Sequence, residues 1–433
     1  MESIWQKSTE RVSFAPLEEN KNTDVLIIGG GMAGILCADR LCRAGVDCIL
    51  VEANHICGGV SGNTTAKVTL AHGLLYHTLI RRFGVEQAGL YLKAQQQALS
   101  EYAGLCEKID CDYRQQDAVV YTLRDKDKVA REIAALKQLG AAVEPTLAEG
   151  LPFAVKGALR VREQAELNPL KLLYTLAKNL PIYEKTKVQE LVGNRAITSR
   201  GEINFKRLVV ATHFPIFNKH GLYFLKMYQH RSYVLALELA VDVGGMYVDE
   251  NDAGLSFRNY GELLLLGGGG HRTGKSGGCW QELEEFAAKH YPHARIVAKW
   301  ATQDCMTLDG MPYIGRYGGS TPDAYVATGF NKWGMTSSMV SAMLLSDLIC
   351  GKVTPYQDLF SPTRSIWRSQ LAKNIFHSTV GLLTPTRPRC PHLGCALKYN
   401  AAEHSWDCPC HGSRFARDGS LQDNPAVRNL KRS

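Results

Sequence analysis

The sequence has 433 residues, of which 45% are hydrophobic and 21% are charged, and its formal net charge is +8. This length is too great for one core of ordinary size and indicates two or three domains. No apolar run approaches the roughly eighteen residues that a membrane-spanning helix needs, and the first residues lack the basic and apolar leader of a secretory signal, so we expect neither.

An apolar run at residues 24–28 indicates a buried parallel strand, and a glycine-rich turn follows at residues 29–34. A helical pattern over about 33–44 and a second apolar strand at 48–51 come next, with Glu52 after that strand. The spaced glycines are Gly29, Gly31 and Gly34. They allow a tight turn close to a pyrophosphate, which the helix N-terminus also attracts, while the acid can bind a ribose. This order of elements predicts a dinucleotide site.

The middle of the chain has a different pattern. Long helical patterns cover residues 85–109 and 125–139, and a strand-like segment follows at 158–161. Strand-like alternation then marks residues from about 219 to 300, which indicates a cap domain built on an antiparallel sheet. A glycine run at 267–270 looks like a phosphate loop, but no Gly-Lys-Ser/Thr sequence completes it.

Two further segments decide which dinucleotide is bound. Residues 308–315 read Leu-Asp-Gly-Met-Pro-Tyr-Ile-Gly, and residues 325–336 end in a Gly-Phe-Asn-Lys-Trp-Gly-Met-Thr turn before a helical run at 338–349. Together with the first motif, these segments resemble the D-amino-acid-oxidase-like flavoprotein family over about residues 20–355. The resemblance implies FAD as the cofactor, a Rossmann-type α/β FAD-binding domain, and an interleaved α+β substrate or cap domain.

The same resemblance assigns roles to individual residues. The loop at 61–67 is implied to reach the pyrophosphate or the ring, and residue 188 to face the adenine. The FAD contacts implied beyond the first motif are Thr64, Thr65, Lys67, Val188, Asp309, Gly329, Gly334, Met335 and Thr336. The strand end after the glycine run is implied to face the substrate side of the flavin, so His271 and Arg272 are candidate substrate contacts. An arginine would suit a carboxylate substrate, and the sequence does not choose between Arg231, Arg258 and Arg272.

The resulting domain prediction has three parts. An FAD-dependent oxidoreductase occupies 1–360, a basic linker helix 361–384, and a small all-β domain 385–433. Within the first part we predict nucleotide-binding segments at about 20–75, 155–215 and 300–355, and substrate or cap segments at about 76–154 and 216–299.

The linker and the last domain carry most of the positive charge. Residues 361–433 contain eleven Lys or Arg against four Asp or Glu, a net charge of +7. Such a field would speed the approach of an acidic electron-transfer partner, although a solvated basic tail is the simpler interpretation. Apolar residues recur at near-helical spacing between 366 and 380. They predict a helix that packs its apolar side on the neighbouring domain, with a helix on a membrane surface as the alternative.

The last domain contains two Cys- and His-bearing loops. Cys390 and His392 stand on the first loop and Cys408 and His411 on the second, with fifteen residues between His392 and Cys408. Two thiolates and two imidazoles are what a [2Fe–2S] cluster needs when one iron takes cysteines and the other histidines. A zinc site would use the same ligand types, but it would leave the additional cysteine on each loop unexplained.

The two loops resemble the Rieske family, in the branch with an extra cysteine on each loop. The resemblance implies that Cys390 and Cys408 bind one iron and that His392 and His411 bind the other. It implies a disulfide between Cys395 and Cys410. Only a short stretch precedes the first loop, so we expect an abbreviated domain whose base is partly supplied by the rest of the protein.

Joining the two ends predicts the function. FAD would take a hydride from a small organic donor, such as an amine or amino acid, and single electrons would pass to the Rieske-type cluster and an external acceptor. One alternative is a flavin and iron–sulfur electron-transfer protein or reductase without its own organic substrate, and another is a simple oxidase with a structural tail. We expect no nucleic-acid partner. Nine cysteines scattered through the first part are typical of a reducing cytoplasm.

Overall fold

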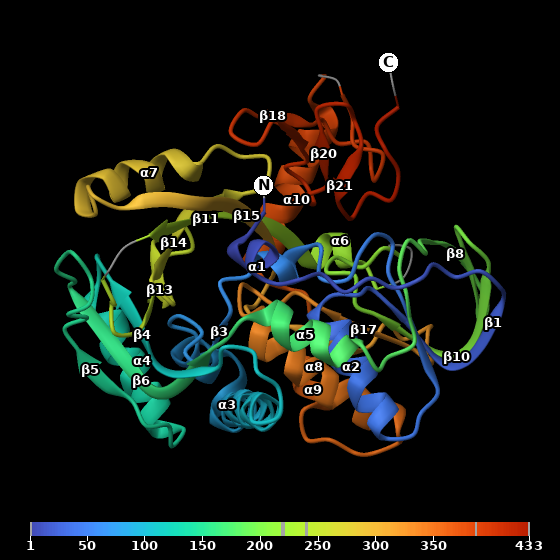
Figure 1. Ribbon diagram of the computed structural model, residues 1–433, viewed down its shortest axis with the longest axis horizontal. Coiled ribbons are helices and arrows are strands. Elements are labelled where there is room, and N and C mark those ends of the chain that lie inside the picture. Colours follow the sequence, from blue (N-terminus) through green and yellow to red (C-terminus); the bar gives the residue numbers. More distant parts are fainter. Residues whose placement is uncertain (1, 218–220, 239–240, 386–387, 432–433) are drawn as a thin grey trace.

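The computed structural model describes residues 2–217, 221–238, 241–385 and 388–431. Figure 1 shows two large sheets with their helices and a small C-terminal unit lying over strands of the second sheet. Within the described residues no helix is both long and apolar enough to cross a membrane.

The first sheet is the one that the glycine motif predicts. Its eight strands, within the described residues, include a parallel core in which β1 pairs with β2 on one side and β10 on the other. In sheet order the strands are β16 (Tyr313–Arg316), β17 (Ala324–Thr328), β10 (Glu202–Val210), β1 (Lys21–Ile28), β2 (Cys48–Val51) and β7 (Ile182–Tyr183). Beside this order, β9 (Arg195–Thr198) pairs with β10 and β8 (Val188–Val192) pairs with β9. All of β2 and the carboxyl-terminal ends of β1 and β10 are continuous buried apolar runs because both faces of the sheet are covered there.

Two apolar helices pack against each other beside this sheet, as Figure 1 shows. One is α2 (Met32–Arg43), which starts at the glycine motif, and the other is α8 (Gly334–Ile349), which starts at the second Gly-rich turn. Both helices therefore begin where their glycine turns end, which brings turns separated by some three hundred residues to one region. The remaining helices of this part are α1 (Ile4–Ser8), η1 (Val60–Asn63), α5 (Pro169–Ala177) and α9 (Gln357–Phe360).

The second sheet has nine strands within the described residues and is mostly antiparallel, as expected for a cap domain. Its strands are β15 (Arg295–Thr307), β11 (Met227–Glu238), β14 (Leu263–Arg272), β13 (Ser256–Tyr260), β12 (Met246–Asp249), β4 (Arg114–Thr122), β6 (Gly157–Glu166), β3 (Lys67–Val68) and β5 (Glu144–Thr146). The associated helices are α3 (Tyr76–Cys106), α4 (Lys126–Gln138), α6 (Tyr223–Lys226) and α7 (Cys279–His290).

Three strands lie in a different sheet from the one that their predicted segments imply. β3 pairs with β6, β6 pairs with β4, and β15 pairs with β11, so all three belong to the cap sheet and not to the nucleotide-binding part. An apolar strand can be recognised from its own residues, but its sheet depends on long-range pairing that local patterns do not encode.

The C-terminal unit is a small all-β domain, as predicted. A four-stranded antiparallel sheet, β18 (Lys398–Asn400), β19 (Ser405–Asp407), β20 (Arg414–Ala416) and β21 (Leu421–Asp423), follows helix α10 (Ser369–Leu383). Figure 1 places α10 and this sheet directly over β11 and β15. The sheet is short, and its own buried apolar cluster contains only seven residues, of which four are cysteines.

Candidate functional site

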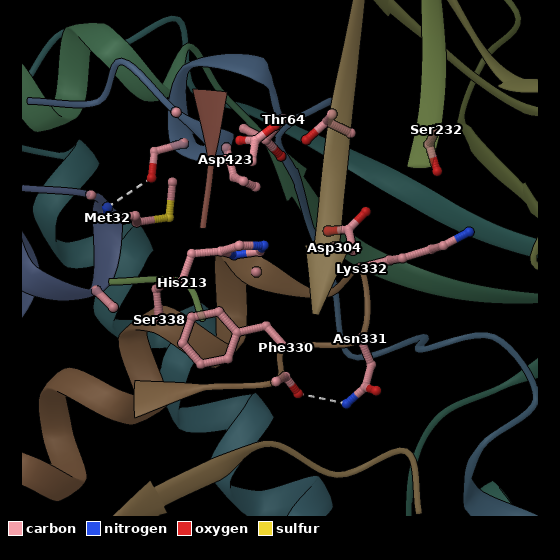
Figure 2. A pocket seen from close by; sticks show the side chains of 18 of the residues that line it. Met32, Thr64, His213, Ser232, Asp304, Phe330, Asn331, Lys332, Ser338 and Asp423 are labelled. Carbon is pink, nitrogen blue, oxygen red and sulfur yellow. Dashed lines mark hydrogen bonds between the residues drawn. The ribbon is translucent and has the colours of Figure 1, made fainter. Parts of the chain in front are cut away.

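A cavity of about 940 Å³ lies where the carboxyl ends of the first sheet's parallel strands meet the cap sheet. Its wall contains the glycine turn after β1, residues of β11 and β15, and the segment 421–429 of the C-terminal unit. Figure 2 shows side chains from all three parts projecting into this space. One cavity is therefore shared by the dinucleotide sheet, the cap and the C-terminal unit.

The glycine turn has the geometry that a dinucleotide requires. Gly29 has φ +113, and a Cβ there would lie 2.5 Å from the carbonyl oxygen of Ala211. A Cβ on Gly34 would lie 2.0 Å from the carbonyl oxygen of Gly29, so α2 packs too closely on the turn for any side chain. Gly29 and Gly31 line the cavity, whereas Gly34 lies behind them and acts through this packing.

Glu52 lies at the end of β2 and lines the cavity, and its role as a ribose acceptor stays a prediction. Its Oε2 accepts a hydrogen bond of 2.8 Å from the Gly30 amide, and its Oε1 accepts one of 2.8 Å from the Asn54 amide. Burial raises the pKa of Glu52, although these amide hydrogen bonds oppose the shift. The carboxylate is thus held rigidly and keeps lone pairs available for hydroxyl groups.

The predicted loop at 61–67 lines the cavity through Thr64, Thr65 and Lys67. Arg258 fixes this loop by donating two hydrogen bonds of 2.8 Å to the carbonyl oxygens of Thr65 and Ala66. Burial lowers the pKa of Lys67 to about 7, with the charge of Arg258 acting in the same direction. Lys67 is therefore a buried cavity amine whose charge an anionic group would favour.

Gly329, Gly334, Met335 and Val188 also line the cavity, and their contacts with FAD stay predictions. Gly329 has φ +71, and a Cβ there would lie 2.4 Å from Cγ2 of Thr307. The start of α8 thus approaches the cavity with its backbone exposed to it.

Two predicted contacts do not line the cavity. Thr336 is buried in α8, and its Oγ1 lies 3.0 Å from Nε2 of His72. Asp309 forms a bidentate ion pair with Arg364, with N–O distances of 2.7 and 2.8 Å. Burial alone would raise the pKa of Asp309, but the Arg364 guanidinium outweighs it and lowers the pKa. Asp309 therefore fastens the segment before α10 to the first domain, a role that requires a partner fifty-five residues away.

The candidate substrate contacts are also placed elsewhere. His271 and Arg272 do not line the cavity. His271 contacts Tyr233, and Arg272 donates a hydrogen bond of 3.3 Å to the carbonyl oxygen of Cys410. The strand that carries them ends at the C-terminal unit, so its last residues face that unit instead of a substrate.

Each of the three candidate arginines has an internal partner. Arg231 pairs with Glu403 of the C-terminal unit, Arg258 lies 3.2 Å from Glu166, and Arg272 is held at the C-terminal unit. Among the described residues that line the cavity there is no arginine. A carboxylate in this cavity would have to bind to another cation.

Among the titratable cavity residues that sequence reasoning missed are Asp304, Lys332 and His213, which Figure 2 labels in the cavity wall. Burial raises the pKa of Asp304 to about 6, with the charge of Lys332 opposing the shift. Burial lowers the pKa of Lys332 and that of His213. Lys332 stands inside the second Gly-rich turn, which could have indicated it, but no local pattern distinguishes Asp304 within β15.

The two Cys/His loops of the C-terminal unit come together. A backbone hydrogen bond closes a tight turn in each loop. The Gly394 amide donates to the carbonyl oxygen of Cys390, and the Gly412 amide donates to that of Cys408, both at 2.9 Å. The rings of His392 and His411 lie with centroids 5.0 Å apart. The structure thus places the two predicted cysteine ligands, Cys390 and Cys408, in side-chain contact, and places the two predicted histidine ligands next to each other.

The donor set fits a cluster with thiolate and imidazole ligands. Nδ1 of His411 is buried without a hydrogen-bond partner among the described residues, as expected of a nitrogen that ligates iron. Burial lowers the pKa of His392 to about 4 and that of His411 to about 3, so both rings are neutral, as metal ligands must be.

The predicted disulfide is not formed in the structure, where Cys395 and Cys410 are free thiols. Their Sγ atoms and that of Cys408 lie within 4.8 Å of one another. Helix α10 covers this side, since a Cβ on Gly381 would lie 2.5 Å from Sγ of Cys410. The pairing of Cys395 with Cys410 stays a prediction.

Two glutamines join the second cluster loop to the cap sheet. Gln229 of β11 donates a hydrogen bond of 3.0 Å to the carbonyl oxygen of His411, and Gln303 of β15 donates one of 2.9 Å to that of Gly412. A Cβ on Gly412 would lie 2.5 Å from Cβ of Gln229. The abbreviated domain thus takes part of its base from the first domain, as expected.

The end of the chain closes the cavity. Asn424 donates hydrogen bonds of 2.6 and 2.7 Å to the carbonyl oxygens of Thr212 and Phe214, on either side of the cavity residue His213. Lys187 donates one of 2.8 Å to the carbonyl oxygen of Val427, next to the predicted adenine contact. The unit that holds the cluster loops is therefore also a wall of the dinucleotide cavity.

Comparisons with known proteins agree with both halves. The "FAD dependent oxidoreductase" family model (DAO) matches residues 24–348, and the "Rieske [2Fe-2S] domain" model matches residues 363–433. The chain is 34% identical to a protein of Bacillus subtilis (strain 168) named as a Rieske 2Fe-2S iron-sulfur protein, YhfW, over 99% of this chain and 97% of that one.

Solved structures share the fold of the larger part. Glycine oxidase from Geobacillus kaustophilus superposes with a TM-score of 0.68 at 21% identity, covering 80% of this chain and all of that one. L-proline dehydrogenase from P. horikoshii superposes with a TM-score of 0.67 at 16% identity, covering 80% of this chain and 98% of that one.

Proposed function

Because this chain belongs to the FAD-dependent oxidoreductase (DAO) family and ends in a Rieske [2Fe–2S] domain, we propose that it oxidises a small amine or amino acid and delivers the electrons singly, through the cluster, to an external acceptor. The supporting observation is that segment 421–429 of the Rieske domain lines the same cavity as the glycine turn and Glu52. A cluster domain that served another protein's flavin would have no reason to form this wall.

The bound groups would supply the electron chemistry, FAD as a hydride acceptor and the cluster as a one-electron centre. The chain's own residues hold them. The glycine turn and Glu52 would hold the dinucleotide, with Lys67 favouring its anionic parts. Cys390 and Cys408 would hold one iron, and His392 and His411 the other. Gln229 and Gln303 fix the His411 loop against β11 and β15, which line the cavity on their other side.

Where the cap sheet meets the second Gly-rich turn, the cavity wall carries Asp304 and Lys332, with Asp249, Glu250 and Asp252 farther along the cap side. Asp304 and Lys332 lie beside each other in Figure 2, and each perturbs the pKa of the other. An amino acid carries an ammonium and a carboxylate on one carbon, so this pair matches both of its charges. Glycine oxidase and L-proline dehydrogenase, which share the fold, are named for amino acids. We therefore infer that Asp304 binds the ammonium and Lys332 the carboxylate.

Asp304 would also handle a proton. An ammonium must lose a proton before the adjacent carbon can release a hydride, and a carboxyl with a pKa of about 6 is ionised and ready to accept it near neutral pH. Lys332, whose Nζ donates a hydrogen bond of 2.5 Å to the carbonyl oxygen of Asp252, is held in place for the carboxylate.

Asp304→Asn is expected to raise KM for an amino acid by roughly 10- to 100-fold, because the ammonium loses its charged partner. In the wild type, kcat/KM should rise with pH through about 6 as Asp304 ionises, and this limb should be missing in the variant. Steady-state kinetics from pH 5 to 9 measure both quantities. Asp127→Asn, an exposed position on α4, is the matched control. An unchanged KM and pH profile would contradict the role of Asp304.

Anaerobic mixing tests the proposed function as a whole. We expect the flavin absorbance to be bleached by at least one member of a panel of amino acids and small amines, and the EPR signal of the reduced cluster to appear in the same samples. Bleaching by NADH alone, with no response to the panel, would favour the alternative of a reductase without an organic substrate. If the flavin is bleached but a fully loaded cluster gives no EPR signal of its reduced state, electrons do not pass from the flavin to the cluster.

A further inference from the structure

The outer face of helix α10 is apolar and exposed. The expectation that this helix packs its apolar side on the neighbouring domain is wrong, since its buried residues are Leu371, Asn374 and Gly381. The exposed large apolar residues of α10 are Ile375 (47% exposed), Phe376 (64%), Val380 (47%), Leu382 (47%) and Leu383 (77%). Trp367, just before the helix, is 81% exposed. Thr379 lies among them, and its hydroxyl donates a hydrogen bond to the carbonyl oxygen of Ile375.

The inner face explains why the helix cannot rotate to bury these residues. Gly381 allows the helix to approach Cys410, whose Sγ would be 2.5 Å from any Cβ at that position. Asn374 donates a hydrogen bond of 3.3 Å to the carbonyl oxygen of Leu225 and accepts one of 3.2 Å from Arg272. Ser378 lies 3.5 Å from Nε2 of the predicted iron ligand His411. The small and polar side of α10 is committed to the cluster loops, so the apolar side faces outward.

The apolar face continues onto a cluster loop. Leu393, next to the predicted iron ligand His392, is 44% exposed. The loop is fastened to the end of α10 by Arg389, which donates hydrogen bonds to the carbonyl oxygens of Leu382 (3.1 Å) and Gly394 (2.8 Å). We call the exposed side chains of Trp367, Ile375, Phe376, Val380, Leu382, Leu383 and Leu393 the α10 face.

Positive charge surrounds the α10 face. Residues 361–402 contain six Lys or Arg and no Asp or Glu. Lys373 and Arg389 are exposed beside the apolar residues. Arg364 does not add to this exposed charge, because it forms an ion pair with buried Asp309. An apolar helix face with aromatic residues and flanking cations matches a surface that is apolar inside and anionic at its border.

We propose that the α10 face docks the protein on the surface of a bilayer that contains anionic lipids, with the His392 loop at the contact. The charge argues against a second copy of this chain, because two regions of net +7 would meet. The face is also poor in groups for the hydrogen bonds of a protein interface, which carries about one per 100–200 Å². Among the described residues at this face, the hydroxyls of Thr379 and Thr384 donate to carbonyl oxygens of the helix itself. Lipid chains need no such groups.

Vesicle sedimentation with the full-length holoprotein tests this inference. We expect binding to phosphatidylcholine vesicles that contain about 30% phosphatidylglycerol, weaker binding at high salt, and little binding to phosphatidylcholine alone. The double variant Phe376→Ser/Leu383→Ser should bind roughly tenfold or more weakly, because two exposed apolar anchors are lost. Tryptophan emission should shift to the blue on binding in the wild type and not in Trp367→Ser.

The controls use exposed apolar residues outside the α10 face. Val353 and Leu147 are 98% and 78% exposed, and Val353→Ser and Leu147→Ser should bind like the wild type. Flavin and cluster absorbance report whether each variant is intact, so loss of binding is separated from loss of folding. Absence of wild-type binding at any phosphatidylglycerol content, or equal binding by the double variant, would overturn the inference. Self-association through the face in ultracentrifugation, abolished by the double variant, would also overturn it. Donor oxidation by the double variant should be unchanged, so this result does not depend on the proposed substrate.

Discussion

Cys390→Ser is expected to empty the iron–sulfur site while leaving oxidation of the organic donor intact. Cys390 is 2% exposed, and the structure pairs its thiol with Cys408 and Ser413, so a serine cannot replace the thiolate that holds iron. Iron and acid-labile sulfide should fall to background. Anaerobic bleaching of the flavin by its donor should keep its rate within about twofold, because the donor end of the cavity lies in another domain.

The same variant should lose transfer to the physiological acceptor by roughly 100-fold or more, because its one-electron centre is gone. Metal analysis, EPR and stopped-flow absorbance measure the three effects on one sample. Cys350→Ser, which alters an exposed cysteine at the end of α8, is the matched control. Undiminished turnover with the physiological acceptor would mean that the Rieske domain is a structural appendage. Turnover with an artificial dye is not diagnostic, since a dye can take electrons from the flavin directly.

Glu403→Gln should destabilise the protein by about 3–5 kcal/mol, because it leaves buried cations without their shared partner. Glu403 is 8% exposed, between Arg231 of β11 (7%) and Arg414 of β20 (5%). Its carboxylate accepts hydrogen bonds from Arg231 (2.8 Å), Arg414 (2.8 Å) and Tyr233 (2.9 Å). A glutamine keeps the shape but removes the charge that pairs with buried Arg231 across the domain interface, whereas Arg414 keeps its ion pairs with Asp407 and Asp423.

Thermal unfolding followed by cluster and flavin absorbance measures this change. We expect the Rieske domain to be affected first, since Glu403 joins it to the cap sheet. Glu262→Gln, in the exposed turn between β13 and β14, should melt like the wild type. A Glu403→Gln melting curve that overlays the wild type would show that the interface does not depend on this carboxylate.

The same carboxylate predicts a pH dependence. Burial alone would raise the pKa of Glu403, but the hydrogen bond and charge of Arg231, together with the charge of Arg414, lower the pKa to about 2. Because this folded-state pKa lies below the unfolded value of about 4.3, the stabilisation is complete above pH 5 and is lost as the pH falls towards 2. The loss should be about 3 kcal/mol in the wild type and absent from the pH–stability curve of Glu403→Gln.

Local chemistry explains which features could be read from the sequence. The turn at Gly29–Gly34 and the Cys/His loops are short, and their residues act within a few positions of one another. The strand that precedes the turn and the acid that follows β2 are likewise set by apolar runs and turn residues. The cofactors and the fold class could therefore be predicted from the sequence alone, and the family comparisons confirm both predictions.

Tertiary structure decided the partners of the charged residues. Asp309 and the arginines at 231, 258 and 272 were candidates for ligand contacts, yet each is used to join segments that are distant in sequence. The sequence around these residues does not indicate their partners, because ion pairing depends on which strands become neighbours and in which register. Asp304 was hidden for the same reason, since an acid in an alternating strand looks like a solvent-facing residue until the cavity beside it is known.

The orientation of α10 was decided in the same way. Its spacing predicts an amphipathic helix, but spacing alone does not say which face turns inward. The cluster loops require a glycine and hydrogen-bonding side chains at close range, so Gly381 and Asn374 face them and the apolar residues face outward. The sequence by itself thus determined two cofactor sites and the presence of this helix. Only the packing of the Rieske domain on β11 and β15 decided that both sites share a wall and that the apolar face stays exposed, because such contacts arise between surfaces that no local pattern describes.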